Sequence, residues 1–132
     1  MAKLAKRLCF QELGDERGHL VVMEGADALP FEVKRVYYIY GTKQGVSRGF
    51  HAHLKLKQVL VAVKGSCVML LDDGKNKEVV TLDDPSQAIM IDSLIWREMH
   101  DFSEDCVLLC LASEEYTESD YIRSYDDFKN IV

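Results

Sequence analysis

The sequence predicts an all-β fold, a barrel of short antiparallel strands in one domain, and three observations lead to it. Short apolar runs alternate with turn signals along most of the chain, which is the pattern of an all-β sandwich or barrel. Asp72-Asp73-Gly74 and Val63-Lys64-Gly65-Ser66 are two strong turn signals. With 132 residues, 48% of them hydrophobic and two prolines, the chain can bury about two-thirds of its unfolded surface. We therefore expect residues 1–132 to form a single domain.

The strands are expected where the apolar runs fall. They are predicted at His19–Glu24, Lys34–Tyr40, Arg48–His53, Gln58–Lys64, Ser66–Asp72, Lys77–Leu82, Gln87–Ile91, Trp96–Phe102 and Cys106–Ala112. The C-terminus changes character, because Thr117–Asp120 resembles a helix start with Thr117 as its cap. Tyr121, Tyr125 and Phe128 then recur at helical spacing. We expect a short C-terminal helix whose aromatic stripe packs on the barrel.

Composition narrows the classes of partner. The formal net charge of −6 argues against nucleic acid, although local arginines can still bind a small anionic ligand. No stretch approaches the roughly 18 apolar residues that span a bilayer, so no membrane partner is expected. The segment Met1–Arg7 is basic but lacks the apolar run of a signal peptide. The four cysteines form no Cys-x-x-Cys pair, which favours a reducing cytoplasm.

The motif His51-x-His53-x4-Gln58-x6-Gly65 is the most informative feature of the chain. Its spacing resembles the first signature of a cupin, a double-stranded β-helix or jelly-roll barrel in which two histidines and a glutamate face one cavity. Gln58 takes the place of that glutamate, and Arg97 takes the place of the histidine of the second signature. A guanidinium repels a cation, and metal ligands are neutral or anionic. The sequence therefore predicts a cupin barrel without a metal site.

Alternation along the strands groups the other candidates. His51 and His53 share one strand face, so two imidazoles enter one cavity and are available for acid/base chemistry. Arg35 and Tyr37 share a face, and Tyr38 and Tyr40 occupy the opposite one. Parity leaves open which of these two faces lines the cavity.

Arg48 stands at the entrance of the strand that carries the histidines. Its planar guanidinium suits a phosphate, and a solvated charge at a strand end is an equally good interpretation.

Several runs together resemble the dTDP-4-keto-6-deoxyglucose 3,4-ketoisomerases, small cupins from the pathways to 3-amino-3,6-dideoxysugars. The runs are Arg35–Ile39, Arg48–His53, Gln58–Val61, Gly65–Cys67, Leu71–Gly74, Trp96–Phe102, Ser119–Arg123 and Tyr125-Asp126. They cover nearly the whole chain, and their combination is specific although the His-x-His element alone is not. One departure is Arg97, where many members of the family carry a histidine.

The resemblance implies a metal-independent isomerase that acts on a nucleotide-linked ketosugar without a cofactor. His51, His53 and Tyr37 are the implied catalytic residues. The implied substrate-binding residues are Arg17, Arg35, Arg48, Gln58, Arg97 and Arg123, with Arg48 and Arg123 at the pyrophosphate. The family also implies a homodimer with an exchanged N-terminal strand, which would place Arg17 near a site.

The reaction moves a carbonyl from carbon 4 to carbon 3 through an enediol. We expect one of His51 and His53 to remove the carbon 3 proton, and the other, with Tyr37, to serve the enediol oxygens. The sequence does not distinguish the two histidines. No Gly-x-Gly-x-x-Gly fingerprint is present to hold a nicotinamide or flavin.

We expect the gluco-configured 3-keto product, because Arg97 is a poor proton donor at the face that it covers. The alternatives are the galacto product, a dTDP-sugar 3,5-epimerase, and a non-catalytic sugar-binding cupin. Gln58 and Arg97 argue against a metal-dependent dioxygenase.

Overall fold

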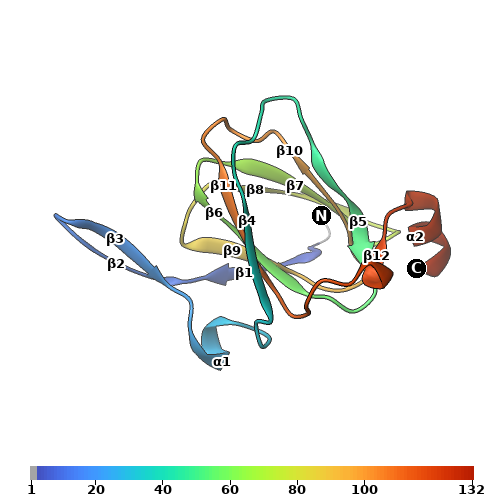
Figure 1. The fold of residues 1–132 in the computed structure, drawn as a ribbon, viewed down its shortest axis with the longest axis horizontal. Coiled ribbons are helices and arrows are strands. Elements are labelled where there is room, and N and C mark those ends of the chain that lie inside the picture. Colours follow the sequence, from blue (N-terminus) through green and yellow to red (C-terminus); the bar gives the residue numbers. More distant parts are fainter. Residues whose placement is uncertain (1–2) are drawn as a thin grey trace.

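The computed structural model describes residues 3–132, so residues 1–2 of the expected domain lie outside the described part. Two five-stranded antiparallel sheets face each other to form a barrel, and a two-stranded hairpin projects from it (Figure 1). The first sheet is ordered β1 (Ala5–Cys9), β9 (Gln87–Ile91), β6 (Gln58–Lys64), β11 (Val107–Ala112) and β4 (Arg35–Ile39). The second is ordered β12 (Tyr121–Ile122), β5 (Arg48–His53), β10 (Trp96–His100), β7 (Cys67–Asp72) and β8 (Lys77–Leu82). The expected all-β jelly-roll barrel with a short C-terminal helix is confirmed.

The core lies between the two sheets because alternate side chains of each strand point inward. Leu60 and Ala62 of β6 face Met69 and Leu71 of β7 within one buried apolar cluster. The second face of β6 is covered too, since Val59 and Val61 are fully buried in a separate cluster on the outer side of the first sheet. This burial on both sides explains the continuous apolar run of β6.

The N-terminal part contains two strands that the sequence pattern did not predict. β1 pairs with β9 at the edge of the first sheet, and its Lys6 and Arg7 are exposed, which hid the apolar alternation. β2 (Gln11–Asp15) is exposed throughout and pairs only with β3 (Gly18–Val22). A strand that contributes nothing to the core has no hydrophobic period to detect.

The C-terminal helix begins later than expected: Thr117 precedes only a 3₁₀ turn, without a capping hydrogen bond from its side chain, and is not the cap of the α-helix. Helix α2 (Tyr125–Ile131) follows Ser124, whose Oγ accepts a hydrogen bond from the Asp127 amide at 3.3 Å. The intervening residues form a 3₁₀ turn (Glu118–Asp120) and the short strand β12, because Tyr121 pairs with His53 across the sheet. Tyr121 therefore does not belong to the helix stripe.

Helix α2 packs on the barrel, and one more helical turn lies near the N-terminus. Phe128 is fully buried against Trp96, as the predicted aromatic stripe requires. A single helical turn, α1 (Gly25–Ala28), follows the hairpin. No helix within residues 3–132 is long and apolar enough to cross a membrane.

Candidate active site

A cavity of about 360 Å³ opens between β4, β5, β10 and β12, and it contains most of the candidates. Its lining consists of Arg35, Tyr37, Ile39, Arg48, Gly49, His51, Met99, Tyr121 and Arg123. The structure answers the parity question of β4, because Arg35 and Tyr37 face this cavity. Tyr38 and Tyr40 point outward, with 61% and 72% of their surface exposed.

A bulge in β5 places Arg48 and His51 on the same cavity although they are three residues apart. Gly49 and Phe50 both have positive φ angles, 92° and 59°. The pairing with β10 skips a residue at this point, since Arg97 pairs with His51 and Glu98 with Gly49. An extra residue in one strand re-aims the side chains that precede it. A regular strand would have turned Arg48 away from the histidines.

The two histidines lie against each other and against Tyr121. The ring centroids of His51 and His53 are 4.8 Å apart, and that of Tyr121 lies 5.0 Å and 4.4 Å from them. Burial, followed by the positive charge of Arg97, lowers the pKa of His51 to about 4 and the pKa of His53 to about 2. Both imidazoles are therefore neutral near pH 7, so each has a free acceptor nitrogen, although the lowered pKa makes each a weaker base than a free histidine.

His53 is held by a carboxylate that sequence reasoning did not identify as part of the site. Its Nδ1 lies 3.1 Å from Oδ2 of Asp120, and both side chains are buried. Asp120 also accepts hydrogen bonds from the backbone amides of Lys55 at 2.8 Å and Leu56 at 3.2 Å. Asp120 therefore lies behind the histidine, outside the cavity lining, and anchors the loop after β5.

Gln58 and Arg97 form a polar chain that ends at Tyr37. Arg97 is fully buried and donates to Oε1 of Gln58 at 2.5 Å and to the Ile95 carbonyl at 2.9 Å. The Gln58 amide then donates to the Tyr37 hydroxyl at 3.1 Å. Burial lowers the pKa of Arg97 to about 10, which leaves the guanidinium charged at neutral pH.

The hydrogen-bonded series Arg97–Gln58–Tyr37 does not suit a divalent metal at the place where cupins bind their ion. The Gln58 oxygen already accepts from Arg97, and the guanidinium charge would oppose a cation. Among residues 3–132, no cluster of three or more His, Cys, Asp or Glu side chains could hold a metal ion.

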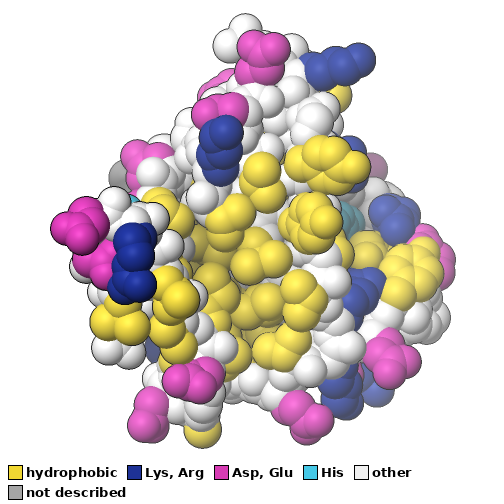
Figure 2. Space-filling view, turned by 60° about the vertical axis from the view of Figure 1, so that its left-hand side comes forward, with side chains coloured by type: hydrophobic (Ala, Val, Ile, Leu, Met, Phe, Trp, Pro, Cys, Tyr) yellow, Lys and Arg dark blue, Asp and Glu magenta, His cyan; other side chains and the backbone are white. Residues whose placement is uncertain are grey.

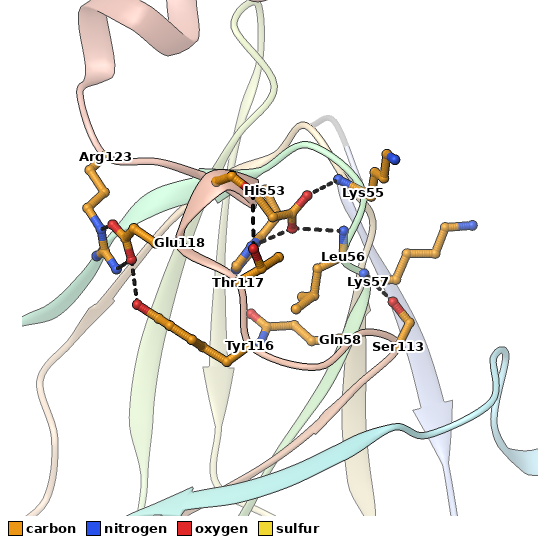
Figure 3. A network of polar contacts seen from close by, with 12 residues as sticks. His53, Lys55, Leu56, Lys57, Gln58, Ser113, Tyr116, Thr117, Glu118 and Arg123 are labelled. Atoms are coloured by element: carbon orange, nitrogen blue, oxygen red, sulfur yellow. Dashed lines mark hydrogen bonds and ion pairs between the residues drawn. The ribbon is translucent and has the colours of Figure 1, made fainter.

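Three arginines surround the mouth of the cavity. The Arg35 guanidinium lies 5.1 Å from the Tyr37 ring centroid, and that of Arg123 lies 4.3 Å from the Tyr121 ring centroid. Arg123 is also paired with Glu118 through two hydrogen bonds of 2.6 Å and 2.9 Å (Figure 3). Together with Arg48, these guanidinium groups offer planar donors suited to phosphate oxygens.

Arg17 is not brought to this cavity by its own chain. It lies at the tip of the β2–β3 hairpin, its side chain is 86% exposed, and it pairs with Asp15. Any role in substrate binding would require a second copy of the chain.

Comparison with known proteins places this arrangement in a family. A family model described as "FdtA: WxcM-like, C-terminal" matches residues 4–132. The chain belongs to this family. It is 50% identical over 127 residues to the TDP-4-oxo-6-deoxy-alpha-D-glucose-3,4-oxoisomerase of Aneurinibacillus thermoaerophilus, covering 96% of this chain and 91% of that protein.

Solved structures agree with this membership. A variant of the 3,4-ketoisomerase QdtA from Thermoanaerobacterium thermosaccharolyticum, in complex with TDP-4-keto-6-deoxyglucose, is 43% identical with a TM-score of 0.95, covering 99% of this chain and 95% of that one. The WlaRB TDP-quinovose 3,4-ketoisomerase from Campylobacter jejuni is 44% identical with a TM-score of 0.92, covering 98% and 99% of the two chains.

Two residues at the site of this FdtA-like chain, Tyr121 in the cavity lining and Asp120 behind His53, escaped the sequence prediction. Asp120 was assigned to a helix start, and Tyr121 to the aromatic stripe of that helix. The available signal was Ser124, a good cap followed three residues later by Asp127. Moving the helix start to Ser124 would have left residues 117–123 free to reach the barrel.

Proposed function

We propose that residues 1–132 act as a single-domain sugar 3,4-ketoisomerase that converts TDP-4-keto-6-deoxyglucose into the TDP-3-keto-6-deoxy sugar. The observation that carries the proposal is a pair of neutral imidazoles: His51 lines a cavity with Tyr37 and three arginines, and the buried His53 ring lies 4.8 Å behind it. The activities named for the relatives support it. We further propose a place in the synthesis of 3-amino-3,6-dideoxysugars, since a 3-keto group is what an amino-transfer reaction would consume.

The reaction requires only proton transfers. A neutral histidine removes the proton from carbon 3 while the carbonyl oxygen on carbon 4 gains a proton, and the electrons move into an enediol between carbons 3 and 4. Carbon 4 is then protonated, and the oxygen on carbon 3 loses its proton as the new carbonyl forms. We expect the Tyr37 hydroxyl, which lines the cavity, to stabilise negative charge on the enediol oxygens, and the buried charge of Arg97 to support it through Gln58. No step exchanges electrons with a cofactor, so none is needed.

Metal independence is part of the proposal, because Gln58 and Arg97 bond to each other where a cupin would bind its ion. Purified protein dialysed against a strong chelator should convert TDP-4-keto-6-deoxyglucose at an unchanged rate, followed by NMR of the sugar. Loss of turnover that returns only with added divalent metal would contradict this part.

The product is proposed to have the gluco configuration at carbon 4. Arg97 is immobilised by Gln58 and Ile95 and remains charged, so it cannot deliver a proton from its side of the ring. A large coupling between the protons on carbons 4 and 5 of the product would indicate the gluco sugar, and a small one the galacto sugar. We expect Arg97→His to raise the galacto fraction, and more so with Arg17 present on a partner. A galacto product from the unaltered chain would show that Arg97 does not set the face of protonation.

The proposed partner is a second copy of this chain, bound through the outer face of the first sheet. That face is apolar, with Val36 58% exposed and Tyr38 61% exposed on β4 beside the apolar cluster of Val59, Val61 and Leu111. Figure 2 shows a broad hydrophobic patch on one side of the molecule. Solvent-facing sides of antiparallel sheets are normally polar, and a patch this wide indicates an interface. The projecting hairpin could then carry Arg17 toward the partner's cavity.

The dimer is tested by a matched pair of substitutions. Val36→Lys places a charge on the proposed interface, whereas Val79→Lys changes an equally exposed valine on the outer face of β8. Light scattering should give twice the chain mass of 15.1 kDa for the unaltered protein and for Val79→Lys, and a monomer for Val36→Lys. A monomeric unaltered protein would contradict the proposal.

We also propose a cytoplasmic location. The buried free thiols of Cys67, Cys106 and Cys110 support it, since they suit a reducing compartment.

A further inference from the structure

We infer that Asp120 is a positioning residue, which holds His53 with its proton on Nδ1 and its Nε2 available to the sugar. The inference deepens the proposed ketoisomerase activity and rests on it. It also separates the two histidines, which the sequence left equivalent.

The contacts of Asp120 determine which nitrogen of His53 carries the proton. Its Oδ1 accepts from the Lys55 amide at 2.8 Å, and its Oδ2 accepts from the Leu56 amide at 3.2 Å. An oxygen held by an amide donor faces Nδ1 of His53 at 3.1 Å. A carboxylate can only accept, so the neutral ring must donate through Nδ1. Nε2, which has no hydrogen-bond partner among residues 3–132, is then the acceptor.

Other contacts fix the orientation of the His53 ring, in addition to the contact with Asp120 that fixes the position of its proton. The backbone of His53 is bonded on both sides, with its carbonyl accepting from the Leu94 amide at 2.7 Å and the following Leu54 amide donating to the Asp120 carbonyl at 3.0 Å. The ring packs against Tyr121, and the side chain of His53 is only 2% exposed. A ring held in this way presents one nitrogen in one direction throughout the reaction.

Asp120 also changes what His53 can do once it accepts a proton. When Nε2 takes a proton from the sugar, the ring becomes an imidazolium with protons on both nitrogens, and it returns the Nε2 proton in a later step. Asp120 stays a carboxylate and faces the new positive charge at hydrogen-bond distance. The burial and the Arg97 charge that disfavour an imidazolium are thus opposed at this one position. After one catalytic cycle, His53 and Asp120 hold the same number of protons as before, and no electrons have left or entered the protein.

His51 has no equivalent support. No carboxylate among the described residues hydrogen-bonds to its ring, which has only a backbone hydrogen bond at Gly49 and the more distant charge of Glu118, and it lines the open cavity. The two histidines therefore differ. His53 is the ring built to hold a transient positive charge, and His51 is the ring more open to the substrate and to water.

The informative substitution is Asp120→Asn, because the side chain keeps its shape while an NH₂ donor replaces one of the two oxygen acceptors. The single amide oxygen would stay with the Lys55 amide, its shorter bond, and the NH₂ group would face His53. Nδ1 must then accept, which moves the proton to Nε2 and blocks it as a base. We expect kcat to fall on the order of 100-fold or more while KM and TDP affinity change about threefold at most.

Two measurements separate positioning from a structural role. Long-range ¹H–¹⁵N NMR of imidazole-labelled protein, without substrate, should show the Nδ1–H form of His53 in the unaltered chain and the Nε2–H form in Asp120→Asn. Ser113→Ala is the matched control, because it breaks a similar anchor of the same loop, the 2.8 Å bond to the Lys57 amide (Figure 3). It should leave the tautomer and kcat unchanged.

An Nε2–H form in the unaltered protein would overturn the inference whether or not the Asn variant folds. So would a folded Asp120→Asn variant with normal kcat, or one whose loss is matched by Ser113→Ala. The tautomer is read without substrate, so this result is independent of the conversion assay that tests the proposed activity.

Discussion

At the scale of single residues, burial has more influence than neighbouring charge on the protonation of the two histidines. Desolvation is the largest cause of the low pKa of both His51 and His53, and Arg97 is the second. The sequence located both rings through their spacing, and parity placed them on one face. It could not reveal Asp120, because a contact across 67 residues between a strand and a turn leaves no local pattern.

Replacing His51 or His53 by Asn should each lower turnover on the order of 100-fold or more, the usual contribution of a positioned acid or base. TDP binding, measured by calorimetry, should be nearly unchanged because the arginines at the cavity mouth remain. His100→Asn is the control, since this ring bonds to Glu98 and Ser47 outside the cavity. Near-normal turnover in both cavity variants would refute the catalytic assignment.

The pH profile provides an independent check of the same two residues. A base must be neutral to accept a proton, and a lowered pKa keeps it neutral to lower pH. Activity should therefore be level down to about pH 5 and decline as the pH falls through about 4, the pKa of His51. Circular dichroism at each pH must confirm folding, because buried neutral histidines also reduce stability in acid. An acid limit between pH 6 and 7 would mean that the histidines are not shielded as described.

At the scale of elements, prediction succeeded best for strands with several buried residues and failed for β1, which has one, and β2, which has none. Arg48–His53 and Gln58–Lys64 have the predicted bounds, because apolar alternation or a continuous apolar run marks a buried strand. β2 has no buried residue and therefore no period. The bulge at Gly49 was equally hidden, since the two-residue period assumes a regular strand, yet it decides that Arg48 reaches the cavity.

The turn between β6 and β7 gives a stability prediction. Gly65 has a φ of +67°, and a Cβ there would lie 2.3 Å from Ser103 Oγ and 2.8 Å from Cys106 Cα. Gly65→Ala should destabilise the fold by about 3 kcal/mol, from both backbone strain and overlap. Gly41→Ala, at φ +66° with no atom near its Cβ, isolates the strain and should cost about 1 kcal/mol. Urea unfolding measures both, and equal costs would contradict the overlap.

At the scale of the whole molecule, the barrel presents two different exteriors. The second sheet is covered by α2 on its outer side near β5 and β12, where Phe128 packs on Trp96, while Val79 on β8 stays exposed. The outer side of the first sheet stays apolar and open around Val36 and Tyr38. The sequence predicted the barrel, because the hydrophobic period of a strand shows which of its side chains are buried. That period does not show whether the same chain or a second copy covers the outer face of a sheet. The proposed second copy would cover that face and complete the site with Arg17.

The central claim is that two neutral histidines move the carbonyl of a nucleotide-linked sugar from carbon 4 to carbon 3. The most direct test is to incubate the purified protein with TDP-4-keto-6-deoxyglucose in D₂O and follow the sugar by ¹H and ¹³C NMR. We expect a carbonyl resonance at carbon 3, a new hydrogen or deuterium at carbon 4, and an unexchanged proton at carbon 5. A carbonyl that stays at carbon 4 while carbons 3 and 5 exchange would indicate an epimerase, and an unchanged sugar would indicate a binding protein; either result would contradict the claim.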